Sequence, residues 1–232
     1  MLKHRDITLT AIVPVFNEKL FLRESINRLL KENVVDEIFI IDDCSTDGSN
    51  QIIDELTNEY NLIKKFKTSH NKGKGAAIRM IQNSINTSYS IIHDADLEYF
   101  PKDIKKLLSE IDKDEPTFVI GSRFINNIEP QNYYRTYFAN KFLSYLFSFV
   151  HRRKVTDIAT CYKLFPNEYF KNTILESNGF EIEVELVAKY LKKYKNIKEA
   201  GIDYESRTYK EGKKIKTLDF FRYIYAIFKF RL

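Results

Sequence analysis

Short runs of apolar residues alternate, along the first half of the chain, with longer segments in which apolar residues recur every three or four positions. The short runs predict β-strands at residues 7–15, 37–41, 62–66, 90–93 and 118–120. Helical spacing follows the first two runs, and further helices are predicted at residues 73–85 and 101–111. Strands that alternate with helices of about a dozen residues indicate βαβ units, and therefore an α/β fold with a mostly parallel central sheet flanked by helices.

The pattern changes in the second half of the chain, which is richer in aromatic residues. It predicts a helix at 133–150, short strands joined by a turn at 155–165, a helix at 180–194 and a strand at 197–204. A polar loop over 205–216 then leads to an amphipathic helix at 217–232. Because the sequence contains no internal repeat and no linker, we expect one domain over residues 1–216, with halves 1–121 and 122–216, followed by the helix.

The composition indicates a folded protein with a buried core. Of 232 residues, 44% are hydrophobic, and Gly and Pro number only 7 and 5, which excludes disordered and collagen-like chains. The two cysteines, Cys44 and Cys161, form no CxxC motif, which excludes a disulfide scaffold and a zinc finger and suits a reducing compartment. The first residues predict a strand rather than a signal peptide, and no run reaches the ~18 apolar residues of a membrane span, so we expect a cytoplasmic protein.

Positive charge is concentrated towards the end of the chain. The formal net charge is +5, but residues 189–232 alone contain 13 Lys and Arg against 5 Asp and Glu. A basic tail on a mildly acidic body favours contact with an anion, such as a phosphate, a membrane surface or a nucleic acid. A solvated helix face would have the same pattern.

Acidic residues follow the second and the fourth predicted strands. Asp94 and Asp96 stand one residue apart, and paired carboxylates of this kind suit Mg²⁺ or Mn²⁺. Taken alone, this triplet fits an exposed acidic turn equally well. Asp42 and Asp43 favour the site, because strands of one parallel sheet deliver both pairs to the edge where open α/β sheets bind ligands.

Two glycines and two lysines occupy the start of the third predicted helix, over residues 71–75. Free amides at a helix start, together with Lys72 and Gly73, would suit a diphosphate. A generic glycine-containing helix start is the alternative interpretation.

These motifs occur in a familiar order. The segments that carry it are 14–18, 42–49, 71–75, 94–96, 121–124, 156–165, 179–185 and 207–215. The ordered set resembles the family 2 glycosyltransferases with the GT-A nucleotide-sugar-binding fold, and within them the dolichyl-phosphate mannose and glucose synthases and their bacterial polyprenyl-phosphate relatives. The resemblance covers nearly the whole chain. It implies inverting transfer of a sugar from a nucleotide diphosphate, with residues 1–121 binding the nucleotide sugar and residues 122–216 binding the acceptor.

The resemblance also implies roles for the matching residues. Those assigned to a UDP- or GDP-linked sugar are Pro14, Phe16, Asn17, Glu18, Asp42, Asp43, Ser45, Lys72, Gly73, Asp94, Ala95 and Asp96. Asp96, helped by Asp94 and Glu98, would hold Mg²⁺ or Mn²⁺, although the mannose synthases often have Gln at the position of Glu98. The implied catalytic residues are Asp96, Arg123 and Glu183.

The acceptor implied by the resemblance is a polyprenyl phosphate. A phosphate is largely ionised at neutral pH, so it needs cations rather than a general base. The cations predicted to hold it are Arg123, Arg135, Arg207, Lys213 and Lys214. Glu183 is the rival clue, because it could act as base for a hydroxyl acceptor such as a glycan in surface polysaccharide synthesis. A carboxylate that only complements a helix dipole is equally compatible with its position.

Two aromatic and basic segments, 133–150 and 217–232, could hold the protein peripherally on the inner face of a membrane, within reach of a lipid acceptor. Packing onto the body, or onto a second subunit in a homodimer, explains the same periodicity. No recognisable nucleic-acid-binding module is present, so nucleic acid is not an expected partner. A binding module without turnover is a further alternative, which the retention of both Asp94 and Asp96 disfavours.

Overall fold

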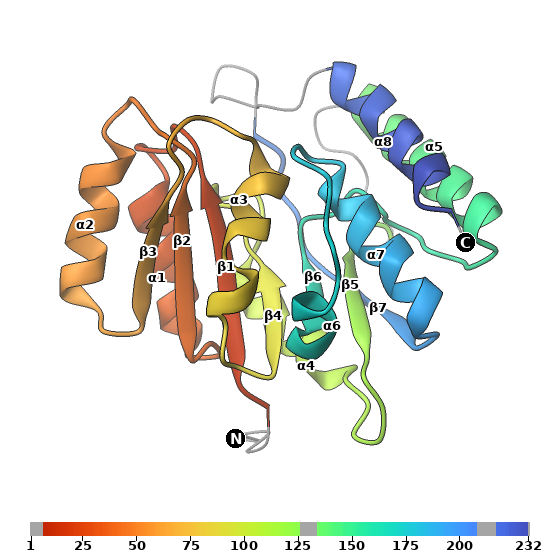
Figure 1. Cartoon of the computed structure of the whole chain (residues 1–232), viewed down its shortest axis with the longest axis horizontal. Coiled ribbons are helices and arrows are strands. Elements are labelled where there is room, and N and C mark those ends of the chain that lie inside the picture. Colours follow the sequence, from red (N-terminus) through yellow and green to blue (C-terminus); the bar gives the residue numbers. More distant parts are fainter. Residues whose placement is uncertain (1–6, 126–133, 208–216, 232) are drawn as a thin grey trace.

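The computed structural model describes residues 7–125, 134–207 and 217–231. At its centre is a seven-stranded sheet with the strand order β3-β2-β1-β4-β6-β5-β7 (Figure 1). The strands are β1 (Leu9–Val15), β2 (Glu37–Asp42), β3 (Ile63–Lys67), β4 (Tyr89–Ile92), β5 (Phe118–Ser122), β6 (Lys163–Pro166) and β7 (Ile197–Gly201). Only β6 among them pairs antiparallel, so the predicted α/β fold with a mostly parallel sheet is confirmed.

Helices connect and cover these strands. The α-helices are α1 (Leu22–Glu32), α2 (Ser49–Glu59), α3 (Lys74–Met80), α4 (Ile104–Ser109), α5 (Tyr134–His151), α6 (Asn167–Lys171), α7 (Ile182–Lys193) and α8 (Thr217–Lys229). Because the middle of the sheet is covered on its faces, strands such as β2 and β4 are apolar without alternation, and residues 38–41 of β2 are completely buried. This is why these strands stand out in the sequence as continuous apolar runs.

The strand ends that carry the predicted motifs lie at one edge of the sheet. β1 pairs in parallel with both β2 and β4, so the segments that follow these three strands start side by side. Because β6 runs antiparallel to β4 and to β5, strands β5 and β7 point in the same direction as β1. The segments after β5 and β7, which contain Arg123 and Arg207, therefore begin at the same edge.

The C-terminal helix α8 packs on the body and also exposes an apolar face. It contacts α5 and α7, and Figure 1 shows α5 and α8 side by side at one end of the molecule. The buried apolar residues in and beside α8 are Tyr223, Ala226, Ile227 and Phe230. Large exposed hydrophobic residues on the two helices are Tyr134, Phe138, Phe142, Tyr145, Phe149, Leu218, Phe221, Tyr225 and Phe228. In the described ranges, no helix is both long enough and apolar enough to cross a membrane.

Some elements differ from the sequence prediction. Segment 155–165 gives one strand, β6, because side chains of α5 bind its first amides: Ser148 Oγ accepts from Val155 N and Ser144 Oγ accepts from Ile158 N. The last strand ends at Gly201 rather than at residue 204, because the amide of Asp203 donates to the Asp103 carboxylate. The third helix ends at Met80 and continues as the 3-10 turn Gln82–Ser84, and the five-residue helix α6 is too short to show periodicity.

Candidate active site

The loops after β1 and β2 are fastened to each other by polar contacts. Asn17 adopts a left-handed backbone conformation, with a φ of 51°. Its amide donates to Ser45 Oγ at 3.0 Å, and its side-chain oxygen accepts from the amide of Thr46 at 2.8 Å. The amide of Glu18 donates to Ser49 Oγ at 2.9 Å. Asn17 and Ser45, both predicted to bind the nucleotide, are therefore brought together, and Phe16 precedes them in the same loop.

Asp42 and Asp43, at the end of β2, have different surroundings. Asp43 accepts from the Thr68 hydroxyl at 2.8 Å and from the amides of Lys72 and Gly73 at 3.0 and 2.7 Å. Its carboxylate thus shapes the segment that leads into α3. Asp42 Oδ1 accepts from the amide of Ser45, whereas its Oδ2 is buried without a hydrogen-bond partner among the described residues.

The start of α3 is occupied by the chain itself. The amides of Gly75 and Ala76 donate to the carbonyl of Asn178, at 2.8 and 3.2 Å. A Cβ atom on Gly73 would lie 2.4 Å from that same carbonyl oxygen, and one on Gly75 would lie 2.4 Å from the carbonyl oxygen of Ser177. The expectation that this helix start offers free amides to a diphosphate is therefore wrong for these two amides, and the glycines admit a neighbouring loop.

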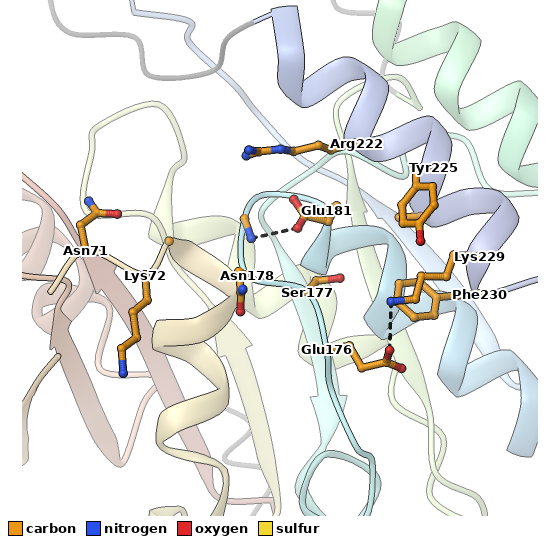
Figure 2. Close-up of a pocket in the computed structure, with 13 residues that line it drawn as sticks. Asn71, Lys72, Glu176, Ser177, Asn178, Glu181, Arg222, Tyr225, Lys229 and Phe230 are labelled. Carbon is orange, nitrogen blue, oxygen red and sulfur yellow. Dashed lines mark hydrogen bonds and ion pairs between the residues drawn. The ribbon is translucent and has the colours of Figure 1, made fainter. Parts of the chain in front are cut away.

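Lys72 instead borders a pocket of about 510 Å³ between the start of α3, the loop before α7, and α8. Figure 2 shows its side chain at one side of this pocket, with Arg222 and Lys229 of α8 across from it. Lys229 pairs there with Glu176 at 2.9 Å. The residues that line this pocket include Lys72 and Gly73 but none of the acids that follow β4.

The acids after β4 surround Arg207, which follows β7. Arg207 Nη2 lies 2.9 Å from Asp96 Oδ2, and Nη1 lies 3.1 Å from Glu18 Oε2. The amide of Arg207 donates to Glu98 Oε1 at 2.8 Å, and the hydroxyl of Tyr204 donates to Glu98 Oε2 at 2.8 Å. Arg207, predicted as a phosphate ligand, is thus found among the predicted donor-site acids.

The neighbouring carboxylates make the site around Asp96 strongly anionic. Burial, followed by the negative charges of Asp94 and Glu98, raises the pKa of Asp96 to about 8, while Arg207 opposes the rise. Ala95, between the two aspartates, is 3% exposed and packs in the core. A carboxylate in such surroundings is stabilised in its charged form by a cation, and among the described residues Arg207 reaches it.

The acids fit a divalent cation by chemistry, because their oxygens are the ligands that Mg²⁺ and Mn²⁺ prefer. The three carboxylates of Glu18, Asp96 and Glu98 already converge on one positive group. Among the described residues, however, no three acidic, His or Cys side chains lie close enough together to form a ready-made metal site. An ion bound by Asp96 would therefore have to take the place of the guanidinium.

Asp94 faces away from Arg207 and towards a buried chain of charges. Its Oδ1 lies 2.7 Å from Lys74 Nζ, which also lies 2.7 Å from Glu183 Oε1. Glu183 Oε2 lies 2.9 Å from Lys163 Nζ, and both of these side chains are buried. Glu183 is therefore held between two lysines. Lys74 and Lys163 had no assigned role in the sequence, although a lysine inside the apolar run of β6 is a recognisable signal.

The remaining predicted cations are dispersed. Arg123 Nε and Nη2 donate to the two oxygens of the buried Asp157 at 2.7 and 2.8 Å, and its guanidinium lies over the Tyr204 ring. Arg135 is exposed in the first turn of α5. Lys213 and Lys214 lie outside the described residues. Cys161 is buried, and burial raises the pKa of its thiol well above the usual value, which suits a packed residue rather than a nucleophile.

The sequence also matches a known protein family. Residues 10–174 match the sequence profile of Glycosyl transferase family 2, a span that contains both aspartate pairs and the start of α3. The chain belongs to this family. The matched span includes the two acid pairs and the strands β2 and β4 that precede them.

Curated relatives of this chain are named as glycosyltransferases. A dolichol-phosphate mannosyltransferase from Pyrococcus furiosus is 27% identical over 232 residues, covering 95% of this chain and 63% of that protein. Glycosyltransferase AglJ from Haloferax volcanii is 26% identical over 183 residues, covering 78% of this chain and 58% of that protein. A dolichyl-phosphate beta-glucosyltransferase from Saccharomyces cerevisiae is 28% identical over 232 residues, covering 87% of this chain and 69% of that protein. The chain thus spans about three-fifths of the length of the first two relatives.

Solved structures show the same fold. Glucosyl-3-phosphoglycerate synthase from Mycobacterium tuberculosis, crystallised with Mn²⁺, UDP and glucosyl-3-phosphoglycerate, has a TM-score of 0.72 at 14% identity, covering 98% of this chain and 81% of that chain. Mannosyl-3-phosphoglycerate synthase from Rubrobacter xylanophilus has the same TM-score at 18% identity. A further structure of the Mycobacterium protein contains Mg²⁺ and UDP. At these identities the similarity establishes the GT-A-like fold of this chain.

Proposed function

We propose that this glycosyltransferase transfers a sugar, with inversion and with the help of Mg²⁺ or Mn²⁺, from a UDP- or GDP-linked donor to a polyprenyl phosphate. Relatives named for transfer to dolichyl phosphate support the acceptor, and fold neighbours crystallised with UDP and Mn²⁺ support the donor and the metal. The observation that carries the proposal is the state of Glu183, the candidate base for a hydroxyl acceptor.

Glu183 is badly placed to accept a proton from a substrate. Each of its oxygens is within 3 Å of a lysine Nζ, and the side chain is 1% exposed. Both oxygens are thus occupied by lysines, and the buried side chain offers no open oxygen to the hydroxyl of a substrate. A phosphate acceptor needs no such base, since it brings its own negative oxygen to the sugar. The buried Glu183 therefore favours a phosphate over a hydroxyl group.

The donor would bind across the strand ends of β1, β2 and β4. In this proposal the nucleotide lies against the loops that contain Pro14 to Glu18, Asp42 to Ser45 and Lys72 to Gly73. Asp96, with Asp94 and Glu98, would hold the divalent cation beside the diphosphate. When bound, such an ion neutralises the charge that develops on the departing nucleoside diphosphate.

The acceptor phosphate would be held by arginines at the other side of the site. Arg123 is fixed by Asp157, which sets the plane of its guanidinium, and Arg207 lies beside Asp96. Arg207 could turn to a phosphate group once its carboxylates are neutralised by another cation. Arg135, Lys213 and Lys214 complete the proposed set of basic residues.

A peripheral position on the inner face of a membrane would bring the enzyme to its lipid acceptor. The exposed aromatic residues of α5 and α8 lie on two adjacent helices, and aromatic faces of this kind bind at the lipid interface. Because the other face of α8 is buried against the body, the helix can contact lipid without detaching from the domain.

The test is a transfer assay with a matched pair of lipids. Purified protein with Mn²⁺ is given UDP- and GDP-sugars together with a short polyprenyl phosphate, the corresponding polyprenol, or a free oligosaccharide. We expect product only with the phosphate, and its loss in Asp96→Asn. Transfer to the polyprenol or the oligosaccharide instead would refute the phosphate acceptor and support the alternative, a hydroxyl acceptor in surface polysaccharide synthesis.

A further inference from the structure

We propose that Lys74 is a positioning residue, which fixes the carboxylate of Asp94 for binding of the metal and the nucleotide. The proposal rests on the function proposed above. Lys74 Nζ lies 2.7 Å from Asp94 Oδ1, and its side chain, at the start of α3, is only 8% exposed. A buried lysine has few alternative rotamers, so Lys74 can fix the orientation of the Asp94 carboxylate.

Four charged side chains from four parts of the fold make up this arrangement. They alternate in sign in the order Asp94, Lys74, Glu183 and Lys163. Lys163 Nζ also donates to the carbonyls of Ile158 and Thr160, so the buried end of the chain is anchored to the backbone. Exposure of the side chains falls from 25% at Asp94 through 8% at Lys74 to 1% or less at the last two. The open end of the chain is thus the aspartate of the candidate site.

Stability alone does not explain this buried network. Removing charges from water is costly, and packed hydrophobic residues of similar size often stabilise a core as well as ion pairs do. An alternating chain does, however, prevent rotation of its terminal carboxylate, because any rotation would break the contact with Lys74. Residues that orient metal ligands in this way commonly matter for affinity without touching the metal themselves.

A pair of matched variants tests the proposal. Lys74→Met and Lys163→Met each remove one buried cation from Glu183, but only Lys74 also contacts Asp94. We expect Lys74→Met to weaken binding of Mn²⁺ with UDP or GDP by about ten- to a hundredfold, the usual effect of losing a residue that orients a metal ligand. Lys163→Met, which is separated from Asp94 by two further side chains, should change this affinity by less than about threefold. Isothermal titration calorimetry at fixed Mn²⁺ measures both.

A further variant covers the case in which Lys74→Met does not fold. Lys74→Met/Glu183→Gln/Lys163→Met removes the three inner charges together, so no buried charge of the chain loses its partner, and it should regain stability while keeping the weak nucleotide binding. Equal affinities of the two lysine variants, or wild-type affinity in the triple variant, would overturn the role of Lys74. A wild-type protein that binds neither UDP nor GDP with Mn²⁺ would instead count against the proposed function, so the two failures can be told apart.

Discussion

Replacing Arg207 with alanine should destabilise the protein in the absence of metal and tighten its binding of Mn²⁺. The guanidinium reaches Asp96 at 2.9 Å, Glu18 at 3.1 Å and Glu98 at 3.8 Å, and all four side chains are about one tenth exposed. Breaking a fully buried ion pair costs about 3–5 kcal/mol. Because these side chains still contact water and Asp96 can take up a proton, we expect a loss of about 2–3 kcal/mol in the free energy of unfolding.

The same contacts, which stabilise the metal-free protein, should weaken its binding of Mn²⁺. If the guanidinium has to leave Asp96 before an ion can bind, about 2 kcal/mol of lost ion pairing weakens Mn²⁺ binding about 30-fold, at 1.4 kcal/mol for each factor of ten. Arg207→Ala should remove this penalty, because the guanidinium that pairs with these carboxylates is then gone.

Urea unfolding in EDTA and a Mn²⁺ titration followed by electron paramagnetic resonance give the two quantities. Arg28→Ala is the control, since Arg28 and its partner Glu24, 2.8 Å away, are 40% and 53% exposed. An exposed pair of this kind contributes less than about 1 kcal/mol. An Arg207→Ala protein that unfolds at the wild-type urea concentration and binds Mn²⁺ with unchanged affinity would refute this account of the site.

Three further predictions follow from burial and close packing. Gly75→Ala should lower the free energy of unfolding by about 1–3 kcal/mol in urea, because its Cβ would lie 2.4 Å from the Ser177 carbonyl oxygen; an unchanged value would contradict the close approach. Burial lowers the pKa of His93 to about 4, so the native state binds a proton less readily than the unfolded chain. Acidification from pH 6.5 to 4 should therefore lower the free energy of unfolding by about 3 kcal/mol, and His93→Asn should not show this loss. Phe221→Ser/Phe228→Ser should reduce co-flotation with anionic vesicles without changing unfolding, because both rings are exposed, and undiminished flotation would exclude α8 as a lipid contact.

The order of strands and helices could be predicted because this sheet is buried on its faces. Residues 38–41 and 91–92 are completely buried, so these two strands form unbroken apolar runs that are bounded by polar turns. The acid pairs at strand ends could be located for the same reason, since each one ends such a run. Segment 155–165 was less predictable, because its amides bind serine side chains of α5, which no local pattern reveals.

Contacts between distant residues account for what the sequence did not disclose. Gly73 and Gly75 suggested a phosphate-binding helix start, whereas their partner is a loop about a hundred residues further along the chain. Arg207 and Asp96 lie more than a hundred residues apart, so only the fold shows that they form an ion pair. Lys163 could have been noticed as a cation in an apolar strand, but the sequence does not say that its partner is Glu183.

The position of β6 has a consequence for engineering. β6 comes from the second half of the chain, yet it is inserted between β4 and β5 and hydrogen-bonds to both, so the two halves share a continuous ladder. A chimaera spliced at residue 121 would have to rebuild that ladder with a foreign strand, and a fragment ending there would expose the unpaired edge of β4 to self-association. New acceptor preferences are therefore better sought by exchanging loops at the strand ends than by recombining whole halves.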